Sequence, residues 1–540
     1  MKRNTRFTTI IALLSVCLIT AIIGSACNAP EQPDLPPASI GPKYGGTLHL
    51  AYVQDITFLD PTKSPSAIDR ALPHLYSNTL VKWTGKNDES PKVEPSLATK
   101  WDISTDGLVY TFYLRQGVKW HNLPPVNGRE FTSSDVKFAI DRIADPKNKL
   151  PLSLYFAAVD HIETPDKYTV KIFMKTPDPS FIFTLCGTVF GAREVAEQDG
   201  DFNKTVIGTG PFMLEKYTPG VGITFVKNPD YWEKGKPYLD RVECTFMSDP
   251  AQRLAAFRAG QIDRLVEGLS NTELIQKSVK DVVVVPGVNI IGSGLAFSLK
   301  QAEKPFANKQ VRQAIQYAID YDGLIQAVLN GAGSRTDYLA PSYRDWGART
   351  VQELPQRDVA KAKSMLSAAG YPNGFSTTLL QHTARMDAWG GAAEPLAAQL
   401  KEVGINAKII PAQQSDYLAK VRVGDYELAT SVLLCAHPDP DNNLTYMYKT
   451  KGGYNRSQYS NARVDELLDK QRKSVGNLTE RQQYVKEIMQ ILSDDVPVIP
   501  LFYQYDFHIT QPWVKGWNNA ADPSTATSLY EVANVWIDKR

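Results

Sequence analysis

The chain has 540 residues and a formal net charge of +1 at pH 7, with 43% hydrophobic and 22% charged residues. This length exceeds what one ordinary hydrophobic core holds, so we expect two or more domains, and the composition excludes a disordered chain. The near-neutral charge excludes the strongly basic balance that is typical of nucleic-acid-binding proteins.

Residues 1–26 have the pattern of a signal peptide. Basic residues lie in the first six positions, an apolar run follows at 10–23, and small residues at 24–26 directly precede Cys27. This order resembles a bacterial lipobox, whose cysteine is lipidated and becomes the mature N-terminus, although Gly24 stands where that motif usually has a large aliphatic residue. The alternative is an uncleaved anchor helix, but the apolar run is short of the roughly 20 residues that a membrane span needs.

Residues 27–42 are expected to tether the folded body to the membrane through the lipid on Cys27. The stretch 28–42 contains five prolines and no hydrophobic period, which is typical of an extended polyproline segment. Removal of residues 1–26 takes away three basic and no acidic residues, so the mature chain carries 56 Lys and Arg against 58 Asp and Glu. The body is therefore expected outside the cytoplasm, in the periplasm or at the cell surface.

After the tether, strand-like and helix-like segments alternate, which is typical of an α/β protein. Runs of β-branched and aromatic residues predict strands at 47–52, 109–115, 168–174 and 282–285. Capping residues three positions apart predict helices that begin at Thr132 with Asp135, at Asp249 with Gln252 and at Thr479 with Gln482. An apolar stripe within 311–319 predicts a helix that packs into the core.

The motifs of several enzyme classes and metal sites are absent from the sequence. It contains no G-x-S-x-G, no H-E-x-x-H and no GxxxxGK[ST], so we expect neither catalysis nor nucleotide hydrolysis. Cys435, His437 and Asp439 could offer metal ligands in principle, but no second ligand pair with C-x-x-C or H-x-x-x-H spacing accompanies them, so we expect no metal site and no cofactor. With Cys186 and Cys244, Cys435 leaves one disulfide conceivable and none assignable.

A series of motifs follows in a fixed order along the body. They are KYGGTLHLAY with FLDPT (43–62), DGLVYTFYLRQGVKWH (106–121), FTSSDVKFAIDRI (131–143), GTGPF (208–212), NPDYWEKGKPYLD (228–240), RLAAFRAGQID (253–263), VRQAIQYAID, AKSMLSAAGYPNGF, YSNARVDELLD and VPVIPLFY. Together they resemble the family 5 extracellular solute-binding proteins, the peptide, nickel and opine receptors of bacterial ABC importers. The resemblance spans nearly all of residues 43–520.

The resemblance implies a two-lobed α/β fold of the periplasmic-binding-protein (Venus flytrap) type, with an extra subdomain inserted in the first lobe. On this chain it places the first lobe at 43–84, 205–290 and 505–540. The inserted subdomain is expected at 85–204 and the second lobe at 291–504.

The resemblance also implies a function. Such a receptor captures a peptide or peptide-sized solute by hinge closure and delivers it to a membrane permease, while a separate ATPase chain drives import. We expect a monomer that binds no nucleic acid. A receptor for nickel, for a metal complex or for another non-peptide solute remains open, as does a sensor that reports its solute to a signalling partner.

The stretch LLCAHPDPDNN at 433–443 falls where many family members have a segment such as W-T-A-D-Y-P-D-P-D-N. In peptide-binding relatives the first Asp of that segment pairs with the α-amino group of the ligand, and alignment through P-D-P-D-N puts Ala436 at this position. A buried ammonium without a carboxylate is costly. Either Asp439 meets the amine, or the cargo is not an ordinary free-amino peptide.

Four other residues complete the expected cargo site. Arg385 and Trp389 occupy a loop where relatives often place second-lobe ligand contacts, an Arg to clamp a carboxylate and a Trp to stack on a planar group. Tyr52, at the end of the first predicted strand, is expected to form a first-lobe wall, and His437 to line the cleft. The alternatives are a solvated Arg385 with Trp389 packed at a lobe edge, and ordinary sheet packing for Tyr52.

Overall fold

The computed structural model describes most of the chain after the tether. Residues 42–540 form one compact unit, the body, which carries the fold described below. Within the described part no helix combines the length and apolar character that a membrane crossing needs. Cys27 and the predicted tether up to residue 40 lie outside the described residues, which are 41–64, 67–84, 92–383, 390–434, 439–517 and 528–538.

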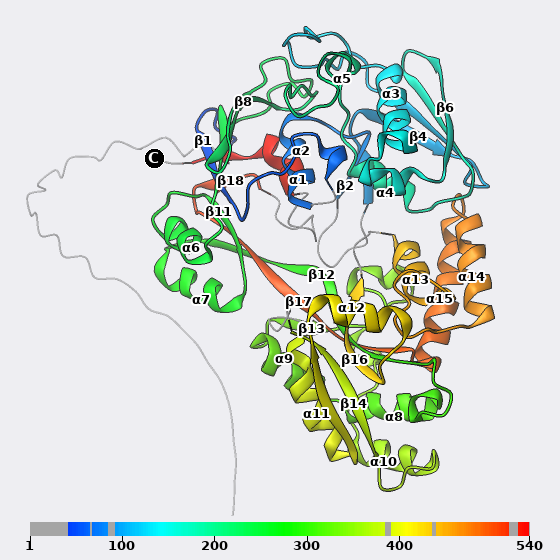
Figure 1. The fold of residues 1–540 in the computed structure, drawn as a ribbon. Helices are drawn as coiled ribbons and strands as arrows, with labels where there is room; N and C mark the ends of the chain where they lie inside the picture. The colour runs from blue at the N-terminus through cyan, green and yellow to red at the C-terminus, as the bar shows by residue number, and fades with distance from the viewer. Residues whose placement is uncertain are drawn as a thin grey trace, which may run out of the picture. The chain divides into compact units, whose positions relative to one another are not determined.

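One mixed sheet of 11 strands runs through the body (Figure 1). Its strands are β1 (Thr47–Tyr52), β8 (Phe212–Thr218), β9 (Gly222–Lys227), β10 (Arg241–Phe246), β11 (Arg264–Glu267), β12 (Val283–Phe297), β13 (Gly333–Arg335), β14 (Phe375–His382), β15 (Ile405–Ala412), β16 (Leu428–Leu434) and β17 (Val498–Thr510). The order is β15-β14-β16-β12-β17-β11-β1-β10-β9-β8, and β13 pairs with β17. The first half of the chain therefore builds one end of the sheet and the second half builds the other end.

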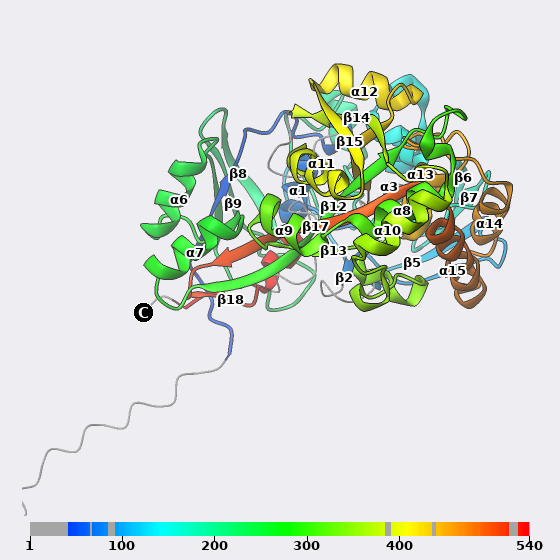
Figure 2. The ribbon, with the colours of Figure 1, turned by 90° about the horizontal axis from the view of Figure 1, so that it is seen from below.

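Two long antiparallel strands, β12 and β17, connect these ends and lie side by side through the middle of the body (Figure 2). Their pairing is regular at each end and shifts in register between the pair Val288 and Tyr505 and the pair Gly292 and Tyr503. A register shift bends a strand locally. The expected lobe boundaries, 290/291 and 504/505, fall at this shift.

We call the end of the sheet built by the second half of the chain (β15, β14 and β16) the far end, and the end built by the first half (β1, β10, β9 and β8) the near end. The far end is buried on both faces because alternate residues of β12 enter different cores. Leu295 and Phe297 pack with the apolar faces of α8 and α11, whereas Ala296 packs with residues of α13 and α15. The helices of this half are α8 (Lys309–Ala318), α9 (Tyr321–Leu329), α10 (Val359–Ala368), α11 (Ala393–Glu402), α12 (Gln414–Val423), α13 (Pro440–Tyr448), α14 (Ala462–Lys473) and α15 (Leu478–Asp495).

The near end of the sheet carries helices α1 (Ala67–Ala71), α2 (Pro73–Tyr76), α6 (Pro250–Arg258) and α7 (Leu269–Ser278), together with the short strand pair β18 (Val514–Lys515) and β19 (Trp536–Ile537). Short 3-10 helices lie between the other elements throughout the body. They are η1 (Pro61–Lys63), η2 (Pro146–Asn148), η3 (Pro151–Phe156), η4 (Pro305–Ala307), η5 (Pro341–Trp346), η6 (Val351–Glu353), η8 (Gly390–Ala392) and η9 (Ser528–Asn534).

A separate four-stranded sheet lies within the range expected for the inserted subdomain. Its order is β4-β5-β7-β6, and helices α3, α4 and α5 accompany it. A core of its own holds these elements together, and Leu80 and Val81 pack into that core, so the β2–β3 hairpin spans the expected boundary at 84/85. The elements are β2 (Val81–Thr84), β3 (Lys92–Pro95), β4 (Ala98–Ile103), β5 (Val109–Leu114), β6 (Val159–Asp166), β7 (Thr169–Met174), α3 (Ser133–Ala144), α4 (Phe181–Cys186) and α5 (Arg193–Asp199).

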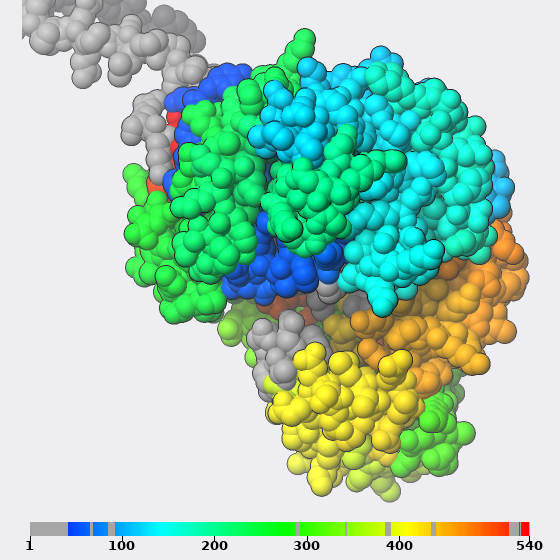
Figure 3. Space-filling view, turned by 45° about the horizontal axis from the view of Figure 1, so that its top comes forward, coloured from blue at the N-terminus to red at the C-terminus, as the bar shows by residue number. Residues whose placement is uncertain are grey.

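The four-stranded sheet also contacts the second half of the chain. A Cβ added at Gly476, between α14 and α15, would lie 2.9 Å from Cα of Thr105 in the β4–β5 turn. A Cβ at Gly107 in the same turn would lie 3.0 Å from the side chain of Val475. Figure 3 shows the cyan surface, which includes the four-stranded sheet, meeting the orange surface of α14 and α15. Glycine is needed here because two backbones approach closely.

The local sequence signals are largely confirmed. The predicted strands at 47–52, 109–115 and 168–174 correspond to β1, β5 and β7, and helix α3 begins with the expected capping box of Thr132 and Asp135. Asp249 caps α6. One helix start is wrong: Asn477, not Thr479, is the N-cap of α15, because the Asn477 side chain accepts a hydrogen bond from the backbone N–H of Glu480. The strand predicted at 282–285 is the start of the longer β12.

Candidate functional site

Tyr52 lines a cavity of about 320 Å³ at the carboxyl end of β1. Strands β1, β10 and β11 are parallel, so their carboxyl ends share one edge of the sheet. The walls come from the ends of β1 and β11, joined by Arg253 of α6, Asp506 of β17 and Leu529. A volume of this size falls in the usual range for small-molecule sites. The cavity therefore lies between the near end of the sheet and a strand that crosses to the far end.

The phenol of Tyr52 stays protonated in this wall. Burial raises its pKa well above the usual value, and the nearby Cys244 adds to the rise. A protonated phenol can donate one hydrogen bond and also present an apolar ring face. The prediction that Tyr52 forms a wall of the cleft is compatible with this position, but its contact with cargo stays a prediction.

The cavity also contains a guanidinium group, that of Arg264 on β11. Its Nη2 lies 2.7 Å from Nδ1 of His508, and its plane lies over the ring of Trp517 at 4.9 Å from the centroid. Burial, with the positive charge of Arg264, lowers the pKa of His508 to about 3, so this histidine is neutral at pH 7 and accepts the hydrogen bond. Arg264 is thereby held in place as a positive charge of the wall.

Asp439 is buried at the start of α13 and has two structural partners. Its side chain accepts a hydrogen bond from the backbone N–H of Asp441 at 2.8 Å, as the N-cap of the helix. Both of its carboxylate oxygens also meet the guanidinium group of Arg481 on α15. A cargo ammonium would have to compete with this ion pair, so a cargo role for Asp439 stays a prediction.

The same ion-pair cluster extends along α14. Asp441 accepts hydrogen bonds from Nε and Nη2 of Arg472, both at 2.8 Å, and from the side chain of Gln471. Gln471 in turn accepts a hydrogen bond from Nε of Arg481 at 2.8 Å. The cluster therefore fixes the first turn of α13 to the two helices behind it.

Several expected site residues lie outside the described part of the chain. They are Arg385, Trp389 and His437, together with Cys435 and Ala436. Among the described residues no group of three or more His, Cys, Asp and Glu side chains could hold a metal ion. Cys186 and Cys244 are buried in different cores.

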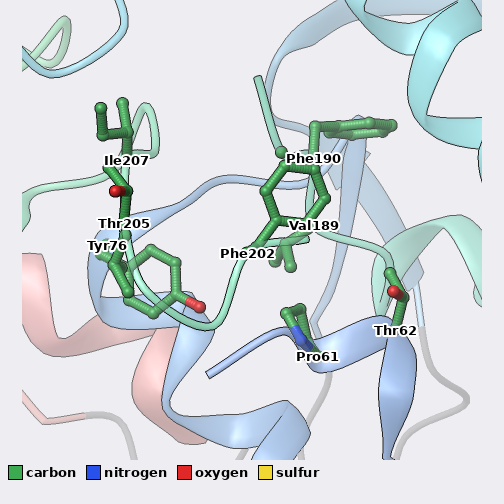
Figure 4. A pocket seen from close by; sticks show the side chains of 10 residues that line it. Pro61, Thr62, Tyr76, Val189, Phe190, Phe202, Thr205 and Ile207 are labelled. Carbon is green, nitrogen blue, oxygen red and sulfur yellow. The ribbon is translucent and has the colours of Figure 1, made fainter. Parts of the chain in front are cut away.

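A second cavity lies near η1, between Pro61, Tyr76 and Phe202 (Figure 4). Its volume is about 20 Å³, room for roughly one water molecule. It is therefore too small for a peptide-sized solute.

Sequence reasoning missed the charged residues of the larger cavity. Arg253 is the first residue of the motif RLAAFRAGQID and Arg264 directly follows it, but nothing in the spacing of this motif shows that α6 and β11 would lie together beside Tyr52. Asp506 and Glu267 come together only through the pairing of β11 with β17.

The model of the family described as Bacterial extracellular solute-binding proteins, family 5 Middle, matches residues 92–455. The chain belongs to this family. Heme-binding protein A of Haemophilus influenzae is 31% identical over 467 residues, which cover 79% of this chain and 82% of that protein. The dipeptide-binding protein of Pseudomonas aeruginosa is 28% identical, with 82% of this chain and 86% of that protein covered.

Solved structures of similar fold support the same assignment. HbpA2 from Haemophilus parasuis gives a TM-score of 0.80 at 25% identity, over 92% of this chain and 100% of that chain. The ABC transporter-associated periplasmic binding protein DppA from Helicobacter pylori, in complex with the peptide STSA, gives 0.69 at 28% identity, over 92% and 99%. The expected two-lobed α/β fold is confirmed, and the relatives of this family 5 protein are solute-binding receptors rather than enzymes.

Proposed function

We propose that this family 5 protein is the lipid-anchored receptor of an ABC importer and captures a peptide or peptide-sized solute by closure of its two lobes. The observation that carries the proposal is the position of the 320 Å³ cavity beside β17, one of the two strands that connect the ends of the sheet. A solute in this cavity that also contacts the far end favours the closed state by its differential affinity. Binding of a micromolar solute releases about 8 kcal/mol, which is ample for a hinge equilibrium of a few kcal/mol.

A peptide is the default cargo because the relatives include a dipeptide-binding protein, di/tripeptide-binding proteins and a glutathione-binding protein. Relatives of comparable identity also include a heme-binding protein and a structure in complex with agropinic acid. Overall identity therefore does not choose the cargo. Ala436, at the position of the usual amine-binding Asp, would on its own favour an amine-capped, cyclic or non-peptide solute, whereas the cavity charges argued in the next subsection favour a solute with a free ammonium.

The test of capture is small-angle scattering of the full chain purified without refolding, with native mass spectrometry of the same sample. We expect a retained solute in the mass spectrum and a smaller radius of gyration when that solute is present. A ladder of peptide masses would support peptide cargo, whereas a single non-peptide mass or a metal complex would replace it. A scattering profile unchanged by the retained solute and by every nutrient tested would overturn capture by closure.

Anchoring is tested separately at Cys27. Cys27→Ser is expected to abolish labelling by radioactive palmitate and to release the protein from the membrane fraction, because a lipid chain is the proposed anchor. Cys186→Ser is the matched control, since this cysteine is buried in the inserted subdomain. Membrane retention of Cys27→Ser without label would indicate the uncleaved anchor helix.

Delivery to a permease is tested in the living cell. Deletion of the gene is expected to abolish uptake of the retained solute. Continued uptake with loss of a transcriptional response to the solute would support the sensor instead.

A further inference from the structure

We propose that the cavity beside Tyr52 selects a zwitterion, with Glu267 taking its ammonium and Arg253 taking its carboxylate. This proposal rests on the proposed function and names the chemical class of the cargo. Both side chains line the cavity, one from the end of β11 and one from α6. The pair would provide, from the first lobe, the carboxylate that the 433–443 loop lacks at Ala436.

One nitrogen of the Arg253 guanidinium, Nη1, makes hydrogen bonds within the protein, and the other two nitrogens can donate to a ligand. Nη1 donates to the backbone carbonyls of Met247 and Ser248, at 2.7 and 2.9 Å. In the described part of the chain no carboxylate pairs with this guanidinium. Nε and Nη2 form the edge that can bind a carboxylate bidentately, and the two backbone contacts fix the orientation of the group beforehand. Arg253 is therefore a positioned positive charge in the cavity wall.

Glu267 is a negative charge that is held in a similar way: one carboxylate oxygen is bound within the protein and the other can bind a ligand. Its Oε2 accepts a hydrogen bond from Nδ2 of Asn271, in the first turn of α7, at 2.8 Å. In the described residues no Lys, Arg or His lies within ion-pair distance of this carboxylate. Oε1 can accept from an ammonium group, and the contact with Asn271 limits the freedom of the side chain. A half-buried carboxylate without a cation gains more from an incoming ammonium than one that is already paired.

The other charged groups of the cavity favour a zwitterion over an anion. Arg264 and Asp506 also line it, so two guanidinium groups face two carboxylates. Arg264 is bonded to His508. The balance is neutral, and a ligand with one positive and one negative group leaves it neutral, whereas a solute with a net charge would bring an unmatched charge into a half-buried site. The apolar side chains of Leu50, Leu265 and Val53 then contact the middle of the solute.

The test compares three forms of one ligand set on the intact protein. The probes are a defined set of alanyl dipeptides with free termini, the same set N-acetylated, and the same set amidated at the C-terminus. Native mass-spectrometric titration gives the affinities. We expect the wild type to prefer the free set at least about tenfold over either capped set, since one charge-assisted hydrogen bond is worth roughly that factor.

Each variant should lose either the preference for free over N-acetylated peptides or the preference for free over amidated peptides, and keep the other preference. Glu267→Gln is expected to bind the free and N-acetylated sets alike and still to reject the amidated set. Arg253→Gln is expected to show the reverse, and Arg253→Lys, which keeps the charge, to restore part of the preference. Arg258→Gln, on the exposed face of the same helix, and Glu273→Gln, exposed on α7, are matched controls that should behave as the wild type.

Two results would overturn the proposal. The first is that the wild type binds the free and capped sets with equal affinity. The second is that Glu267→Gln and Arg253→Gln still prefer the free set as strongly as the wild type does. Either result leaves the receptor function intact if scattering still shows closure around another solute. Absence of closure with every solute would instead reject the receptor function itself. Thermal unfolding of each variant checks that loss of the contacts from Arg253 to residues 247 and 248 has not unfolded the protein.

Discussion

The guanidinium group of Arg481 meets both carboxylate oxygens of Asp439, with Nη1 at 2.7 Å from Oδ2, although 42 residues separate the two in sequence. Both side chains are buried. Asp439 also caps α13, so the pair fixes the start of this helix to α15.

Loss of this pair should be costly. Asp439→Asn would leave Arg481 buried without its counterion, and such changes typically destabilise by about 3 to 5 kcal/mol. We expect a loss of about 3 kcal/mol or more in the free energy of unfolding, measured in urea. The matched control is Asp416→Asn, which breaks an exposed ion pair with Lys420 at 3.1 Å and should cost less than about 1 kcal/mol. Equal losses in the two variants would contradict the structural role of the pair.

The motif GTGPF is expected to stabilise the fold because its glycines let two backbone segments pack closely. A Cβ added at Gly208 would lie 1.9 Å from the carbonyl oxygen of Tyr76, at the end of α2. Because a backbone atom cannot rotate away, Gly208→Ala should destabilise the protein by several kcal/mol or prevent its accumulation. Gly187→Ala serves as the control, since its Cβ would lie 3.8 Å from the nearest atom. Normal yield and melting temperature of Gly208→Ala would contradict this prediction.

The sequence could predict the family and the individual elements, because caps and strand runs are local signals. Thr132 with Asp135 and the strand at 47–52 are examples, since each depends only on neighbouring residues. The cavity charges could not be predicted because Arg253, Glu267 and Asp506 meet only after β11 pairs with β1 and β17. For Asp439 the sequence could show a carboxylate in a cargo loop, but its ion pair with Arg481 depends on how α13 packs on α15.

The second-lobe prediction for Arg385 is independent of the cavity pair. Arg385→Ala is expected to weaken binding of a carboxylate-bearing cargo by more than about tenfold, or 1.4 kcal/mol, because a bidentate contact would be lost. Calorimetry with the solute identified by native mass spectrometry measures the change. Arg422→Ala, an exposed residue of α12, is the control. Unchanged affinity would remove Arg385 from the site.

Acid stability should depend on His121, which follows β5 of the four-stranded sheet and contacts the GTGPF segment. Its ring lies between the backbone N–H of Gly208, at 3.3 Å, and the carbonyl of Gly210, at 3.2 Å. Burial lowers its pKa to about 4 from the usual 6.5, so the ring is neutral in the folded state. The unfolded chain therefore binds one more proton than the folded protein between pH 4 and 6.5. The contribution of the neutral His121 ring to the free energy of unfolding is therefore fully present above pH 6.5 and is lost as the pH falls toward 4.

The slope of unfolding free energy against pH measures this effect. One proton corresponds to about 1.4 kcal/mol per pH unit, so His121 alone contributes about 3 kcal/mol across the window. Burial also lowers the pKa of His74 and of His508, each to about 3, and both add to the same slope. We expect His121→Gln to reduce the slope between pH 4.5 and 6 by about one proton. Between pH 7 and 8 the slopes of variant and wild type should coincide, because these histidines are then neutral in both states. An unchanged slope in the acid window would mean that His121 is protonated in the folded protein.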